Sequence, residues 1–200
     1  LKRRNYHLST GFVGTPLLCP VLTRFGRIDL AYKLLFNDAY PSWLFPIKNG
    51  ATTMWERWNS WTPEGFGDDS MNSFNHYAYG AIGEWLYDTV TGIRELDAGY
   101  KRILLRPQLG DKLTHAAASL NTPHGEVSSA WKRTKKTITW TVVVPPNTSA
   151  VAVPPTASLD TVKANRKPWS EHSGLSLADT IDGCAAITLI PGRYVFTMPV

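Results

Sequence analysis

Five carboxylates lie in or just after residues 40–71, a segment rich in Trp, Pro and Gly: Glu56, Glu64, Asp68, Asp69 and Glu84. Glu56 differs from the others because Trp55 and Trp58 flank it. A carboxylate among indole rings is partly desolvated, which raises its pKa and strengthens it as a base. The chain has no Gly-rich phosphate loop, no zinc-ligand spacing and no Gly-x-Ser-x-Gly motif. Its residues therefore favour carboxylate acid–base chemistry, with no metal and no cofactor expected.

Two interpretations of Glu56 stay open at this point. In the first, Glu56 is a general base in a functional loop, since loops of this length inside a compact domain are usually functional. In the second, Glu56 pairs with an arginine and only holds the loop together. Arg57 is adjacent and would offset the effect of the indoles, so the direction of the pKa shift is undetermined.

Two other polar positions are candidates. His76, in Asn75-His76-Tyr77, is expected in the first turn of a helix, where added positive charge is disfavoured. A histidine there tends to stay neutral and to act as a hydrogen-bond partner; a solvated surface histidine is the alternative. Asp68 and Asp69 are consistent with a metal site or a helix cap, and the cap is favoured because no third oxygen ligand is evident.

The elements that would position these residues are helices. Thr15-Pro16 predicts a helix start, with the Thr15 hydroxyl as the cap; its apolar face would comprise Leu17, Leu18, Val21 and Leu22. A second helix is expected from Ile28 to Asn37. A third is expected over residues 74–89, since its apolar positions follow helical spacing: Phe74, Tyr77, Ala78, Ala81, Ile82, Trp85 and Leu86.

After Gly99 the pattern changes to the period of two that is typical of strands. Short runs rich in β-branched residues, separated by Pro and Gly, predict an antiparallel β-sandwich. The expected strands are 101–106, 113–119, 125–133, 136–144, 149–153, 185–190 and 193–198. Ile138, Trp140, Val142 and Val144 would form one inward face, while residues 155–180 show no clear pattern. The domain boundary is expected at residues 98/99.

Composition excludes several classes of protein. The net charge is +5, but the basic residues are scattered, and the run Lys132–Lys136 fits the turn of a hairpin better than a nucleic-acid surface. No apolar run is long enough to span a membrane. Cys19 and Cys184 are far apart and are expected to be buried free thiols, which leaves the compartment open. The first residues, Leu-Lys-Arg-Arg, lack an initiator Met, which suggests part of a longer protein.

An ordered set of motifs carries a resemblance to a known family. The motifs are Thr10-Gly-Phe-Val-Gly-Thr-Pro16, Tyr40-Pro-Ser-Trp43, Gly50-Ala-Thr-Thr-Met-Trp-Glu-Arg-Trp58, Met71-Asn-Ser-Phe-Asn-His-Tyr-Ala-Tyr-Gly80 and Gly83-Glu-Trp-Leu-Tyr87. Gly99-Tyr-Lys-Arg-Ile103 and Val144-Pro-Pro-Asn147 extend the set. Together they resemble the C-terminal third of glycoside hydrolase family 78, the bacterial-type α-L-rhamnosidases. The resemblance covers nearly the whole chain and is weakest over residues 155–185.

The resemblance implies a multi-domain fold of α and β parts. Residues 1–98 would be an all-α segment, the last helices and active-site loop of an (α/α)6 barrel, and residues 99–200 an antiparallel β-sandwich. The family's motif puts the general base of an inverting hydrolysis on Glu56 and the rhamnose contact on His76, with Trp55 and Trp58 as further substrate-binding residues. Asn59 departs from the family, in which Asp is common at this position, and receives no role.

The same resemblance implies that half of the catalytic pair is absent. An inverting glycosidase uses two carboxyl groups about 6.5–9.5 Å apart, and the family's general acid lies upstream of this segment. We therefore expect the 200-residue chain to be inactive alone and to need the missing N-terminal part of the catalytic domain as its partner. Helices without their neighbours would expose apolar faces and invite self-association. The expected substrate is a rhamnose-containing glycoside or polysaccharide.

Two alternatives remain. The first is a non-catalytic carbohydrate-binding sandwich, which would depend on Trp131, Trp140 and Trp169. The second is another (α/α)-barrel glycosidase with a different sugar specificity, against which the ordered motifs argue.

Overall fold

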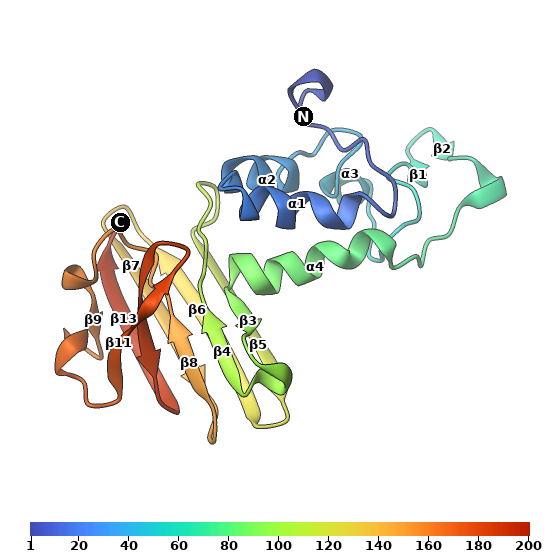
Figure 1. Ribbon diagram of the computed structural model, residues 1–200. Helices are drawn as coiled ribbons and strands as arrows, with labels where there is room; N and C mark the ends of the chain where they lie inside the picture. The colour runs from blue at the N-terminus through green and yellow to red at the C-terminus, as the bar shows by residue number, and fades with distance from the viewer. The chain divides into compact units, whose positions relative to one another are not determined.

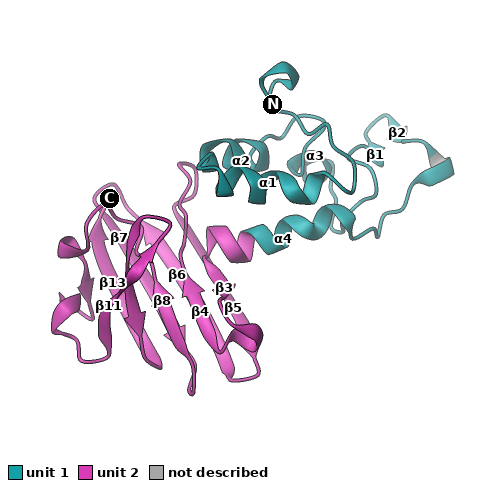
Figure 2. Cartoon of the chain, viewed as in Figure 1, with its two compact units in different colours: residues 1–85 teal, residues 86–200 magenta. Residues whose placement is uncertain are grey.

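The chain forms two compact units, residues 1–85 and 86–200, in the computed structural model (Figures 1 and 2). The structure describes residues 1–68 and 70–200; Asp69 is given only its place in a short helix. The sequence-based boundary at residues 98/99 falls inside the second unit and stays a prediction about domains.

The first unit is mainly helical. Its α-helices are α1 (Thr15–Arg24), α2 (Ile28–Leu35), α3 (Leu44–Lys48) and α4 (Ile82–Trp85). Short 3-10 helices are η1 (Lys2–Arg4), η2 (Asp69–Met71) and η3 (Ala78–Ala81), and strands β1 (Trp61–Thr62) and β2 (Gly65–Phe66) form a small hairpin. The helix starts predicted at Thr15 and Ile28 are confirmed. Residues 40–71, expected to be one long loop, contain α3 and this hairpin.

Helix α1 buries a different face from the one predicted. Thr15 and Cys19 are buried, and the Cys19 thiol lies 3.9 Å from the Ala31 carbonyl oxygen of α2. Of the predicted apolar face, Leu18 and Leu22 are half-buried, but Leu17 and Val21 are 58% and 48% exposed, so half of that face is wrong. The Thr15 hydroxyl does not cap the helix: it donates to the Thr10 carbonyl oxygen. Because α1 is apolar on more than one side, only packing against α2 selects its buried face.

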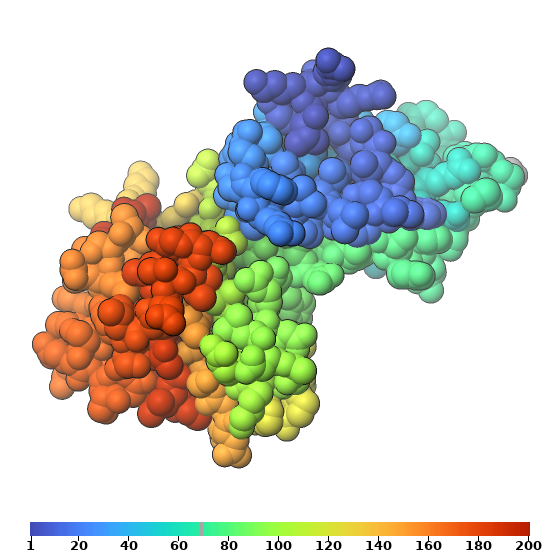
Figure 3. Space-filling model, in the orientation of Figure 1, coloured from blue at the N-terminus to red at the C-terminus, as the bar shows by residue number. Residues whose placement is uncertain are grey.

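The exposed side of α1 carries an apolar stripe. Its members recur every four residues, from the turn before the helix to the residue after it: Val13, Leu17, Val21 and Phe25. Leu17 and Val21 lie within α1 itself. In the space-filling view the N-terminal segments and α1 form the blue surface of the first unit (Figure 3). Within the described residues, nothing in the first unit covers this stripe.

The third predicted helix begins later than expected. Helical structure starts at Ala78, continues as α4 and ends as the π-helix η4 (Leu86–Val90) in the second unit. Tyr77, predicted to be apolar core, is 89% exposed, whereas Tyr79 and Trp85 are buried. Residues 73–76 are not helical because they pair with residues 53–56 instead.

The second unit consists of two sheets. The first has the order β10-β9-β13-β7-β6-β5 and the second β11-β12-β8-β4-β3. The strands are β3 (Ile93–Glu95), β4 (Arg102–Leu105), β5 (His115–Thr122), β6 (Gly125–Arg133), β7 (Thr137–Val144), β8 (Ser149–Ala152), β9 (Lys163–Ala164), β10 (Lys167–Pro168), β11 (Leu175–Ile181), β12 (Cys184–Leu189) and β13 (Gly192–Pro199). The short 3-10 helices η5 (Ala98–Tyr100), η6 (Leu159–Thr161) and η7 (Trp169–Glu171) lie between strands.

All seven predicted strands are confirmed within a few residues, and the run Lys132–Lys136 does span the turn between β6 and β7. The strands that the sequence did not predict are β3, β9, β10 and β11. Strand pairing is antiparallel except between β4 and β8, which are parallel. A helical part followed by a β-rich part with antiparallel sheets therefore agrees with the predicted fold class.

The core of the second unit consists of side chains that face inward from the two sheets. Ile138, Trp140, Val142 and Val144 of β7 are buried as predicted, and Trp140 packs on Phe196 of β13. Trp131 is also buried, so two of the three tryptophans on which a sugar-binding sandwich would depend are core residues. Cys184 is exposed, which corrects the prediction of two buried thiols. It is the first residue of β12, directly after the turn from β11, and the first two residues of this strand are exposed.

No helix in the described part of the chain is both long and apolar enough to cross a membrane.

Candidate active site

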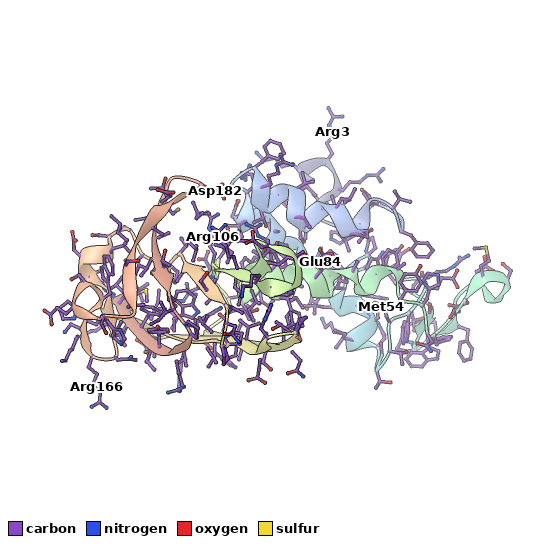
Figure 4. The ribbon with its side chains drawn as sticks, turned by 60° about the horizontal axis from the view of Figure 1, so that its bottom comes forward. Arg3, Met54, Glu84, Arg106, Arg166 and Asp182 are labelled. Carbon is purple, nitrogen blue, oxygen red and sulfur yellow. The ribbon has the colours of Figure 1, made fainter. Side chains whose placement is uncertain are left out.

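The Glu56 side chain is held by the backbone of a second segment. The Ser73 backbone N–H donates a hydrogen bond of 2.8 Å to Oε2 of Glu56. In return the Glu56 N–H donates to the Ser73 carbonyl oxygen at 2.9 Å, and the His76 N–H donates to the Met54 carbonyl oxygen at 2.8 Å. Met54 is labelled in Figure 4. These bonds tie the Trp-Glu-Arg-Trp segment to the Asn-His-Tyr segment, so Glu56 and His76 share one local framework.

Arg57 does not neutralise its neighbour Glu56. Its Nε donates to the Met71 carbonyl oxygen at 2.8 Å, and its Nη2 lies 3.3 Å from Oδ2 of Asp68. Among the described residues, no cation lies within ion-pair distance of Glu56, and its Oε1 accepts no hydrogen bond. The second interpretation, in which Glu56 pairs with an arginine and only holds the loop together, is therefore not supported by the described residues. One carboxylate oxygen is anchored, and the other has no hydrogen-bond partner among the described residues.

Trp55 and Trp58, the tryptophans that flank Glu56 in sequence, are buried in aromatic clusters. They are only 6% and 7% exposed. The Trp55 ring meets Phe74 edge-on at 5.3 Å, and the Trp58 ring stacks on Tyr79 with 3.9 Å between ring centroids. The Trp43 indole N–H donates to the Tyr79 carbonyl oxygen at 3.1 Å and fixes this stack from the other side. Their direct contact with a sugar stays a prediction.

His76 precedes the helix in which it was expected. Its Nδ1 accepts a hydrogen bond from the Ala78 N–H at 3.4 Å, so in the neutral ring the proton is on Nε2. The ring is half-buried and stacks between Phe12 and Tyr77. The His76 ring is thus in contact with neighbouring aromatic rings and, contrary to the prediction from the sequence, does not lie in the first turn of a helix.

The other candidate carboxylates have local structural roles or lie at the surface. Asp68 accepts from the Ser70 N–H and caps η2, as favoured from the sequence, and the Ser70 hydroxyl lowers the pKa of Asp68. A hydrogen bond from the Thr62 side chain lowers the pKa of the exposed Glu64. Glu84 is exposed on α4 (Figure 4). The prediction for Asp69 lies outside the described residues.

An open hollow of about 580 Å³ is lined in part by Trp58 and Tyr79. The rest of its lining comes from Tyr40-Pro41 and from the N-terminal residues Arg4, Asn5, His7, Leu8, Ser9 and Thr10. Glu56 and His76 do not line it, so this hollow is separate from the carboxylate that the sequence singles out.

Sequence reasoning missed three residues that shape the site: Phe12, Ser73 and Tyr79. All three lie inside motifs that carried the family resemblance, and that position was the only available signal. Ser73 contributes through its backbone N–H, which every residue except proline has, so no side-chain pattern could reveal it.

Comparison with known proteins assigns both units. Residues 1–90 match the model of the bacterial α-L-rhamnosidase 6-hairpin glycosidase domain, and residues 92–167 match the bacterial α-L-rhamnosidase C-terminal domain. An α-L-rhamnosidase of Formosa agariphila is 51% identical over 191 residues, which is 95% of this chain and 21% of that protein.

Solved structures agree with this match. The α-L-rhamnosidase of Streptomyces avermitilis, crystallised with L-rhamnose, is similar over 98% of this chain, with a TM-score of 0.88 and 42% identity. The α-L-rhamnosidase of Dictyoglumus thermophilum is similar over 99% of the chain, with a TM-score of 0.84 and 34% identity. The chain covers 18% and 22% of those two structures, or about a fifth of the length of its relatives. This chain belongs to the bacterial α-L-rhamnosidase family and carries part of the six-hairpin glycosidase domain followed by the C-terminal domain.

Proposed function

We propose that this chain is part of an inverting α-L-rhamnosidase that removes terminal α-L-rhamnose from glycosides or polysaccharides, with Glu56 as its general base. The observation that carries the proposal is the state of the Glu56 carboxylate. Oε2 is anchored by the Ser73 N–H, while Oε1 accepts no hydrogen bond from the described residues. A fixed carboxylate with one available oxygen can orient and deprotonate a water molecule.

The reaction needs a second carboxyl group. Glu56 takes a proton from water as the water oxygen attacks the anomeric carbon, on the face opposite the departing group. A carboxylic acid then protonates the glycosidic oxygen as its bond to that carbon breaks, which gives rhamnose and an alcohol. Asp68 is paired with Arg57 and hydrogen-bonded to Ser70, and Glu64 and Glu84 are exposed, with no hydrogen bond to Glu56 in the described part of the chain. The acid is therefore assigned to the remaining part of the six-hairpin domain.

The neighbours of Glu56 have supporting roles in the proposal. His76 would donate its Nε2–H to a hydroxyl of rhamnose, because Nδ1 is already used by the Ala78 N–H. Trp55 and Trp58 would present their few exposed atoms to the sugar and exclude water behind the carboxylate. In this division residues 1–98 belong to the catalytic domain and residues 99–200 to the sandwich.

A hybrid enzyme tests the proposal. The chain replaces the matching segment of the Formosa agariphila relative, which is 51% identical to it over 191 residues. With an aryl α-L-rhamnoside, we expect turnover by the hybrid and none by the 200-residue chain alone. Glu56→Gln in the hybrid should lower kcat by about 100- to 10,000-fold.

Two results would overturn it. Turnover by the chain alone would contradict the missing general acid. Full activity of the Glu56→Gln hybrid would remove Glu56 as the base. Glu64→Gln is the matched control, since this exposed carboxylate bonds only to its own hairpin and should be replaceable without loss.

A further inference from the structure

The imidazole of His76 lies within a stack of three rings. Phe12 lies on one side, with 4.6 Å between ring centroids and 22° between ring planes. Tyr77 lies at 5.9 Å and 14°. The Phe12 contact is the closer one, and Tyr77 is almost fully exposed. Phe12 therefore provides the main aromatic surface against His76.

Phe12 also packs against Tyr79, which stacks on Trp58 of the Trp-Glu-Arg-Trp motif. Its ring packs against Tyr79 at 5.0 Å with a tilt of 60°, and Tyr79 stacks on Trp58 at 3.9 Å. A continuous series of ring contacts thus runs from the Trp-Glu-Arg-Trp motif to His76. Phe12, which is far away in sequence, is the link between them.

The polar contacts of His76 do not by themselves determine the orientation of its ring. The hydrogen bond from the His76 N–H to Met54 positions the backbone only. The bond from the Ala78 N–H to Nδ1 is 3.4 Å long, beyond the usual 2.7–3.2 Å of a strong N–H donor. A bond of this length restrains the plane of an imidazole only weakly, whereas a flat ring packed face to face fixes that plane. Within a fixed plane the Ala78 bond has only to select between two ring orientations related by a half-turn.

We propose that Phe12 is a positioning residue for His76: by stacking on the imidazole it keeps the ring in the plane in which Nδ1 accepts from the Ala78 N–H, which leaves Nε2–H to bind another partner. The effect on catalysis rests on the proposed function, in which that Nε2–H contacts rhamnose. The geometric part of the proposal, the orientation of the His76 ring, does not depend on that function. Tyr and Trp have the flat face that this role requires, and Leu has similar bulk without it.

The geometric part is tested on the chain itself by the ring ¹⁵N shifts of His76. We expect one tautomer, protonated at Nε2, in the parent chain and in Phe12→Tyr. Phe12→Leu should give shifts averaged between the two tautomers, because the long bond to Nδ1 is then the main remaining restraint. Tyr77→Leu is the control and should leave a single tautomer. A single tautomer in Phe12→Leu would overturn the proposal.

The catalytic consequence is tested by a double-mutant cycle in the hybrid enzyme. Phe12→Leu should lower kcat/KM by about three- to tenfold, the equivalent of one aromatic pair. Phe12→Tyr should restore it. In the His76→Ala background Phe12→Leu should cost nothing further, because the residue through which Phe12 acts is gone. Additive losses would overturn the proposal. If His76→Ala alone costs nothing, the proposed rhamnose contact is wrong, and the ring ¹⁵N shifts still decide the role of Phe12.

Discussion

The Ser73 backbone N–H lies 2.8 Å from Oε2 of Glu56, and it anchors the carboxylate without any cation. A bond of this kind depends on an acceptor oxygen and not on a full negative charge. Catalysis and local stability therefore respond differently to substitutions at this position.

Glu56→Gln should separate these two properties. The amide oxygen still accepts from Ser73, so the melting temperature should stay close to that of the parent. Glu56→Ala leaves the Ser73 N–H without its acceptor and should cost about 1–3 kcal/mol. Thermal unfolding of the two variants of the chain measures the difference. Equal destabilisation by both would mean that the charge, and not the hydrogen bond, holds the loop.

Two glycines with nearly equal φ form a matched pair. Gly92 and Gly183 have φ angles of 77° and 75°. A Cβ at Gly183 would meet nothing within 4 Å, but at Gly92 it would lie 2.2 Å from the Arg106 carbonyl carbon. Gly183→Ala should cost only the left-handed backbone penalty, about 1–2 kcal/mol.

Gly92→Ala adds a clash with the backbone and should lower the free energy of unfolding by several kcal/mol more. Urea unfolding of both variants checks this. If the two losses are equal, the backbone around residues 106–107 moves aside easily, and the close approach of Gly92 to it has no structural importance.

The two thiols should react very differently. Cys184 is exposed, whereas Cys19 is buried between α1 and α2, and burial raises the pKa of Cys19 from 9.0 to about 12. A maleimide should modify one thiol in the native chain and both in urea, as counted by mass spectrometry. Rapid modification of Cys19 in the native chain would indicate frequent separation of the two helices.

The raised pKa of Cys19 also predicts that the free energy of unfolding decreases at high pH. The unfolded chain releases the Cys19 proton above pH 9.0 and the folded chain only near pH 12. This contribution is therefore fully present below pH 9 and decreases as the pH rises toward 12, by up to about 1.4 kcal/mol per pH unit. The comparison is with Cys19→Ser, which does not titrate: the difference between the two stability curves should change above pH 9 and stay constant below it.

The exposed stripe on α1 should make the isolated chain self-associate. Val13, Leu17, Val21 and Phe25 present a row of apolar side chains to solvent. Replacing Leu17 and Val21 by Gln should shift sedimentation toward the monomer at a given concentration. Leu177→Gln, at a still more exposed apolar position on β11, is the control. An unchanged distribution in the α1 variant would place the association elsewhere.

The sequence by itself determined the fold class, most element positions and the residues with the capacity for chemistry. Strands were predictable because one sheet face is core: the alternation of Ile138, Trp140, Val142 and Val144 can only be satisfied by an extended chain with one buried side. Glu56 stood out through its indole neighbours, and the ordered motifs indicated the family. Each of these signals involves residues that are close together in the chain, so a single sequence is enough to detect it.

Tertiary structure alone decided which faces are buried and what each polar group contacts. Helix α1 is apolar on two sides, and only α2 selects the side of Cys19. Helical spacing extended the third helix back to Phe74, but hydrogen bonds to residues 53–56 compete successfully for that segment. The sequence left open whether Arg57 pairs with Glu56, and in the structure Arg57 bonds Met71 and Asp68 instead. Ser73 contributes to the site through its backbone N–H, and Phe12 through a ring contact with a distant segment. Neither contact produces a periodic pattern in the sequence, because each joins segments that only the folded chain brings together.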